Sequence, residues 1–192
     1  MRAKAPSTKT KHEVLNMKTS LRFAAMLLTV LLCLPLAACA PDTDLPDGMI
    51  RATDGTTDFD LFVPDDWTVD LTGAAVSAYK SASDPTSVSV MSWALPHADS
   101  TVGDWWETYK SEFEMVFSEF TLETDGEDTL LDGAAAKKYV YTGRLGENTY
   151  RYTQLASARG GIVYLLTVTE ITASGVDHTE DIDKITENFR WK

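Results

Sequence analysis

The chain has 192 residues, with 29 Asp and Glu against 17 Lys and Arg and a formal net charge of −12 at pH 7. A surface of this sign repels nucleic-acid phosphates, so we expect no nucleic-acid binding. Both cysteines, Cys33 and Cys39, lie near the N-terminus, which leaves the rest of the chain without a disulfide or a cysteine site.

Residues 1–38 have the layout of a secretory signal peptide. Basic residues precede the apolar run Phe23 to Leu34, which Pro35 ends before a stretch of small residues. A membrane-spanning helix needs about 20 apolar residues, so the signal-anchor alternative is disfavoured. Met17 offers a second start site that would give a leader of more usual length.

Leu36-Ala37-Ala38-Cys39 closes this segment and resembles the lipobox of bacterial lipoproteins. The resemblance implies cleavage between Ala38 and Cys39 and a lipid on the Cys39 thiol. It also implies an extracytoplasmic protein held by lipid at the outer face of the cell membrane, or at the outer membrane where the envelope has two. An ordinary secretory signal, in which Cys39 is incidental, is the alternative.

Residues 39–48 contain prolines and aspartates without apolar periodicity, which predicts a flexible tether. We expect one folded domain over residues 49–192, long enough to bury a core of its own. Its acidic surface is interpreted chiefly as a solvated face, with cation or basic-partner binding as the alternative.

The first half of this domain predicts short strands followed by one helix. Pro64-Asp65-Asp66 marks a turn, and Ser83-Asp84-Pro85-Thr86 predicts a hairpin. Apolar side chains then recur every three or four residues from Val102 to Phe117, and Thr101 with Asp104 forms a capping-box variant. The expected strands are 49–53, 59–63, 67–69, 76–81 and 87–94.

The second half returns to strands joined by short glycine-containing links, which predicts antiparallel neighbours. Ile162 to Leu166 is apolar on both faces and therefore predicts a central, covered strand. Asp177 to Glu180 predicts the start of a final helix, and Asp125 to Asp128 an acidic turn. The expected strands are 120–123, 128–131, 134–142, 149–156 and 162–169.

Several phrases in this order resemble PsbP-like domains. They are residues 59–67, with their Pro-x-x-Trp ending, residues 131–139, residues 161–167, and residues 185–190, where Asn188 stands in place of the usual serine. The resemblance implies an α+β fold, an α/β/α sandwich with an antiparallel sheet of about six or seven strands and helices on both faces. It implies a binding or assembly factor and carries over no functional residue.

Trp105 and Trp106 are the candidate partner contacts. Neighbours on a helix point about 100° apart, so both rings cannot sit squarely in one interface. We expect one at the edge, where it either covers the sheet rim or serves as an exposed anchor for a partner.

No motif of the sequence predicts catalysis, and we expect no cofactor and no metal. The only histidines after the leader, His97 and His178, are not placed beside an evident nucleophile. The aspartates between residues 42 and 48 lack the closing glutamate of a calcium loop. We therefore expect a non-enzymatic envelope factor that meets an unknown envelope protein or small ligand; the alternative is an envelope-polymer hydrolase that uses paired carboxylates.

Overall fold

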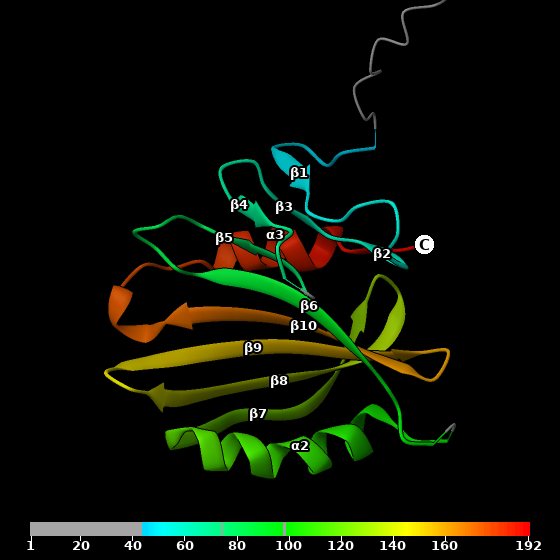
Figure 1. Ribbon diagram of the computed structural model, residues 1–192, viewed down its shortest axis with the longest axis vertical. Coiled ribbons are helices and arrows are strands. Elements are labelled where there is room, and N and C mark those ends of the chain that lie inside the picture. Colours follow the sequence, from blue (N-terminus) through cyan, green and yellow to red (C-terminus); the bar gives the residue numbers. More distant parts are fainter. Residues whose placement is uncertain (1–43, 74, 98) are drawn as a thin grey trace, which may run out of the picture. The chain divides into compact units, whose positions relative to one another are not determined.

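A computed structural model describes residues 44–73, 75–97 and 99–192 (Figure 1). The predicted signal peptide, Ala38, Cys39 and the first part of the tether lie outside these residues, and the predictions about them stay predictions. Within the described ranges, no helix is both long and apolar enough to cross a membrane.

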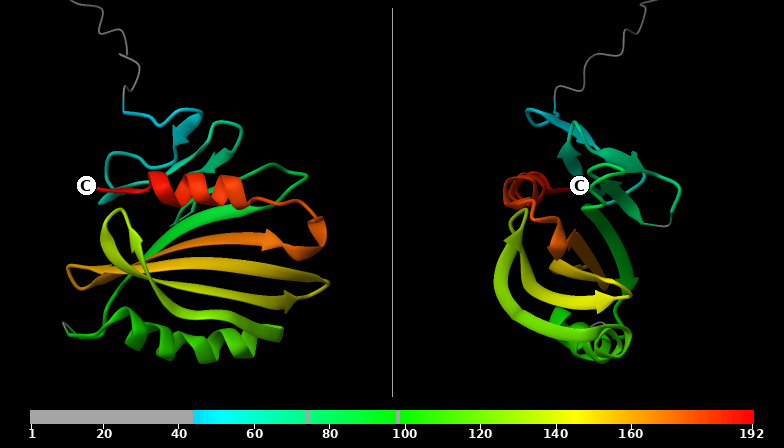
Figure 2. Two further views of the ribbon diagram at one scale, coloured as in Figure 1. Left: turned by 180° about the vertical axis from the view of Figure 1, so that it is seen from behind. Right: turned by 90° about the vertical axis from the view of Figure 1, so that its left-hand side faces the viewer.

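The core of the domain is a seven-stranded antiparallel sheet in the order β4-β5-β6-β10-β9-β8-β7. Its strands are β4 (Thr68–Asp70), β5 (Val76–Tyr79), β6 (Ser87–Ala94), β7 (Ser118–Leu131), β8 (Ala134–Leu145), β9 (Asn148–Arg159) and β10 (Ile162–Ile171). The predicted antiparallel sheet of about six or seven strands is confirmed, with seven. β10 is the middle strand, as its apolar run predicts, and Figure 2 shows that the sheet is strongly curved.

The long β7 corrects one prediction. Residues 125–128 do not form a turn between two strands; β7 continues through them, with a register shift between Asp125 and Glu127. Gly126 takes a φ of +74°, a left-handed conformation that an L side chain rarely adopts. A Cβ built there would lie 3.3 Å from the ring of Tyr139, so glycine both permits this bulge and makes room for the ring.

Two small antiparallel pairs lie beside the main sheet. β1 (Met49–Arg51) pairs with β3 (Phe62–Pro64), and β2 (Phe59–Asp60) pairs with β11 (Arg190–Trp191) at the end of the chain. The expected strand 59–63 is therefore divided between two partners. The segment before β1 contacts the domain, since Arg190 Nη1 lies 2.9 Å from Asp44 Oδ1.

Helix α2 (Val102–Val116) begins as the capping box predicts. Thr101 Oγ1 accepts a hydrogen bond from the Asp104 N–H at 3.1 Å, and Asp104 Oδ2 accepts one from the Thr101 N–H at 2.8 Å. The buried residues of α2 share a cluster with Val163 and Leu165 of β10.

Helix α3 (Thr179–Asn188) follows a short 3-10 turn at Thr172–Ser174. Its buried Ile185 belongs to a second cluster, which contains Tyr164 and Leu166 of β10 and the residues of β3. Because side chains alternate along a strand, the two clusters occupy the two faces of β10. In Figure 1, α3 lies beside β3 and the small strands, and α2 lies beside β7.

Candidate functional site

Trp105 and Trp106 are both buried, with exposed fractions of 4% and 1%. The Trp106 ring stacks on Tyr139 at 4.0 Å between centroids, and its Nε1 donates a 2.9 Å hydrogen bond to Asp125 Oδ1. The Trp105 ring packs against Trp93, and its Nε1 has no hydrogen-bond partner among the described residues. Of the two alternatives, a ring that covers the sheet rim and an exposed anchor, neither ring is exposed here; a partner contact would require α2 to move and stays a prediction.

His178 holds the start of α3 to the hairpin between β5 and β6. It is buried, with Nε2 3.0 Å from Asp84 Oδ2 and Nδ1 3.8 Å from Asp181 Oδ2. Burial alone raises the pKa of Asp84, but hydrogen bonds from Thr86 and the charge of His178 outweigh it and leave the pKa lowered. These contacts give His178 a structural role at this end of the sheet.

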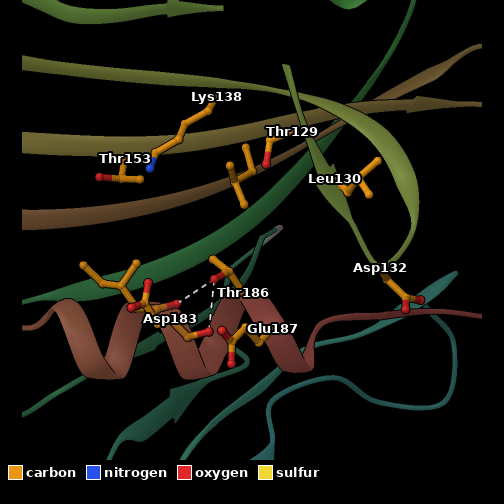
Figure 3. Close-up of a pocket in the computed structure, with 10 residues that line it drawn as sticks. Thr129, Leu130, Asp132, Lys138, Thr153, Asp183, Thr186 and Glu187 are labelled. Atoms are coloured by element: carbon orange, nitrogen blue, oxygen red, sulfur yellow. Dashed lines mark hydrogen bonds between the residues drawn. The ribbon is translucent and has the colours of Figure 1, made fainter. Parts of the chain in front are cut away.

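A cleft of about 260 Å³ lies between α3 and strands β7, β8 and β9 (Figure 3). Thr129, Lys138, Thr153 and Leu155 line its sheet wall, and Ile182, Asp183, Thr186 and Glu187 line its helix wall. Residues from two distant parts of the chain therefore meet here. Sequence inspection does not single out any of them, because their spacing forms no known motif.

The register of the sheet decides which lysine reaches the cleft. Lys138 pairs with Leu155, whose side chain belongs to the cluster on the α3 face, whereas Lys137 pairs with Ala156 of the cluster on the α2 face. Lys137 Nζ lies 2.7 Å from Asp128 Oδ1. Lys138 has no ion-pair partner within the described part of the chain.

Two hydroxyl groups accompany Lys138 on the sheet wall. Thr153 is only 8% exposed, and neither it nor Thr129 makes a side-chain hydrogen bond to another described residue. Figure 3 shows Lys138 and Thr153 extending from the sheet on the side that faces α3. The Thr153 hydroxyl is not among the side-chain atoms that are sealed from solvent without a partner, so water or a ligand in the cleft can hydrogen-bond to it.

The helix wall carries two carboxylates four residues apart. Asp183 and Glu187 fall on one side of α3, with no ion-pair partner among the described residues. Thr186 lies between them and donates its hydroxyl proton to backbone oxygens, 3.0 Å from Ile182 O and 3.1 Å from Asp183 O. Lys184 pairs instead with Glu180 at 2.8 Å.

The groups in this cleft suit binding. A glycosidase-type mechanism needs two carboxyl groups that flank the scissile bond; here Asp183 and Glu187 come from the helix wall, and Asp132, at the β7–β8 end, already accepts a 2.7 Å hydrogen bond from the Trp191 N–H. No imidazole lines the cleft in the part of the chain described. The groups present can donate and accept hydrogen bonds and can hold charges of both signs.

A second cleft, of about 340 Å³, lies on the other side of Ile182. Its cation, Arg151, is already paired with Glu123 at 3.1 Å and with Glu170 at 3.9 Å. Burial raises the pKa of Glu170, and the charge of Arg151 offsets only part of this shift. The second cleft thus lacks the unpaired cation that distinguishes the first.

Neither a protein-family model nor a curated protein matches the sequence. Among solved structures, the chain is similar to cyanobacterial PsbP (CyanoP) from Synechocystis, with a TM-score of 0.57 and 15% identity over 82% of this chain and 99% of that one. It is also similar to LpqN of Mycobacterium tuberculosis, a protein involved in cell envelope biogenesis, with a TM-score of 0.54 and 16% identity over 74% of this chain and 89% of that one. The fold is therefore PsbP-like.

Proposed function

We propose that this protein is a lipid-anchored extracytoplasmic lipoprotein whose PsbP-like domain binds a ligand or partner of the cell envelope without catalysing a reaction. The observation that carries the proposal is the PsbP-like fold directly downstream of a lipobox-like sequence that ends at Cys39. The similarity to LpqN supports an envelope role.

We also propose that the domain is an α/β/α sandwich with helices on both faces of the sheet, as the resemblance to PsbP-like domains implies. This proposal is supported by the buried residues of α2 and α3, which belong to two different clusters, one on each face of β10. We take the cleft beside α3 as the binding site because Lys138 and the Thr153 hydroxyl both line it and neither has an ion-pair or hydrogen-bond partner for its side chain among the described residues.

The anchor is tested by metabolic labelling with an alkyne analogue of palmitate. The wild-type chain should incorporate the label in the membrane fraction, and Cys39→Ala should lose it. Cys33→Ala is the matched control, because this thiol lies within the apolar run of the signal peptide and should be removed with it. Equal labelling of Cys39→Ala and wild type would contradict lipid anchoring at this residue.

The binding site is tested by photocrosslinking in intact cells. Leu130 is 66% exposed at the rim of the cleft, and Met115 is 78% exposed near the end of α2. A photoreactive amino acid at position 130 should give a mass adduct by intact-protein mass spectrometry, whereas the same residue at position 115 should not. An adduct at position 115 alone would move the binding site away from the cleft.

A further inference from the structure

We propose that the cleft between α3 and strands β7–β9 binds a small zwitterion of the amino-acid class. The ligand's carboxylate lies at Lys138 and its ammonium group lies at Asp183 and Glu187. This inference rests on the proposed binding function and specifies the chemistry of its ligand.

The cation of the cleft is unusual for this acidic chain. Of the Lys and Arg residues within the described ranges, all but Lys138 and Arg159 have a carboxylate within 4.0 Å. Arg159 instead lies over the Trp191 ring, 4.6 Å from its centroid. Lys138 has neither kind of contact, although it is partly buried and acidic residues outnumber basic ones in the protein. A partly buried charge gains most from a new counter-ion, because its hydration is already reduced.

The hydroxyl groups point to a carboxylate as that counter-ion. Thr153, more than nine-tenths buried and without a side-chain hydrogen bond to another described residue, lines the same wall as Lys138, with Thr129 beside them. A carboxylate has two oxygens and accepts several hydrogen bonds at once, from an ammonium group and from hydroxyls alike. One planar anionic group can therefore satisfy donors that the protein leaves unused.

The opposite wall, with the exposed carboxylates of Asp183 and Glu187, disfavours ligands of a single charge. A simple anion at Lys138 would face Asp183 and Glu187 across the cleft, in a protein whose net charge of −12 already repels it. A simple cation at the two carboxylates would face Lys138. A zwitterion meets an opposite charge on each wall and has no net charge for the protein to repel.

The cleft is open to solvent on one side, and the volume that it encloses suits a small ligand. Its volume of about 260 Å³ corresponds to roughly nine water molecules at about 30 Å³ each. Drug-sized ligands occupy pockets of about 300–1,000 Å³. A free amino acid or an ω-amino acid suits the smaller space.

Isothermal titration calorimetry of the full chain, purified from membranes in detergent, tests the proposal. The probes are alanine and β-alanine, with propionate and ethylamine as analogues that each keep only one charge. We expect at least one zwitterion to bind, and each single-charge analogue to bind at least about tenfold more weakly, since one charge-assisted contact is lost. Propionate binding as tightly as either zwitterion, or no binding by either zwitterion, would overturn the assignment.

Adjacent lysines give a matched pair of variants. Lys138→Met should weaken binding by about tenfold or more, and Asp183→Asn should weaken it in the same direction. Lys137→Met should leave binding unchanged, because its side chain lies on the other face of β8 and pairs with Asp128. An unaltered circular dichroism spectrum checks that each variant folds. Equal effects of the two lysine substitutions would refute the proposal.

The two proposals fail in different measurements. If the proposed lipid anchor at Cys39 is wrong, Cys39→Ala and wild type are labelled equally. That result does not change the titration of the zwitterions. If only the proposed ligand class is wrong, neither zwitterion binds, but the protein is still labelled at Cys39 and still crosslinks at position 130.

Discussion

Replacing Trp106 with phenylalanine is expected to destabilise the domain more than the same change at Trp105. Both rings are buried, with exposed fractions of 1% and 4%, so both substitutions remove the same atoms from the interior. The difference lies in the indole N–H. That of Trp106 donates to the Asp125 carboxylate at 2.9 Å, whereas that of Trp105 has no partner among the described residues.

The magnitude follows from this one hydrogen bond. A hydrogen bond to a charged group contributes about 1.5–3 kcal/mol, and an unpaired buried donor costs about 1–3 kcal/mol. The Asp125 side chain is 46% exposed, so water can replace the lost donor. The contribution of this hydrogen bond to stability therefore lies at the lower end of the range of about 1.5–3 kcal/mol. Trp106→Phe should therefore cost about 2 kcal/mol more than Trp105→Phe, or roughly 4–8 °C in Tm for a domain of this size.

Equilibrium urea unfolding followed by far-UV circular dichroism measures both free energies, because backbone amides dominate this signal and its midpoint still reports unfolding after a tryptophan is replaced. A double-mutant cycle of Trp106→Phe with Asp125→Ala should give a coupling of about 1 kcal/mol or more. Equal losses for the two single variants, or a coupling near zero, would refute the assigned role of the hydrogen bond.

Three further changes test other parts of the fold. Gly143→Ala should destabilise by roughly 1–3 kcal/mol, because an added Cβ would lie 2.5 Å from Phe117 Cγ; thermal unfolding measures this. Thr101→Ala should cost about 1 kcal/mol through loss of the α2 cap, read from urea unfolding. Glu170→Gln should raise Tm at pH 7, because burial raises the pKa of Glu170 in the folded state and its ionised form therefore opposes folding. That gain should fade as the pH falls below the carboxyl's ordinary value, where the wild-type group is protonated in both states. Unchanged stability in Gly143→Ala, equal stability of Thr101→Ala and Thr101→Ser, or a Glu170→Gln gain that persists at low pH would each contradict the corresponding argument.

Local patterns in the sequence determined much of the fold. The aromatic spacing of residues 102–117 and the Thr101–Asp104 cap predicted α2, because a helix depends on contacts three and four residues apart. The apolar run at residues 162–166 predicted the central strand β10, since only a strand covered on both faces is apolar at every position. The order of these elements and several short phrases led to the resemblance to PsbP-like domains, which implied helices on both faces of the sheet.

The tertiary structure alone decided the rest. The acidic run at residues 125–127 has the composition of a turn, but pairing with β8 extends it into a bulged strand. That strand places the Asp125 carboxylate within hydrogen-bond distance of Trp106 Nε1, and both tryptophans of α2 are buried. Lys137 and Lys138 are adjacent and chemically identical, and only the register of β8 sends one to an ion pair and the other to the cleft. Contacts between distant segments set strand register and pack α3 beside β3, with the cleft between α3 and β7–β9, and no local periodicity encodes them.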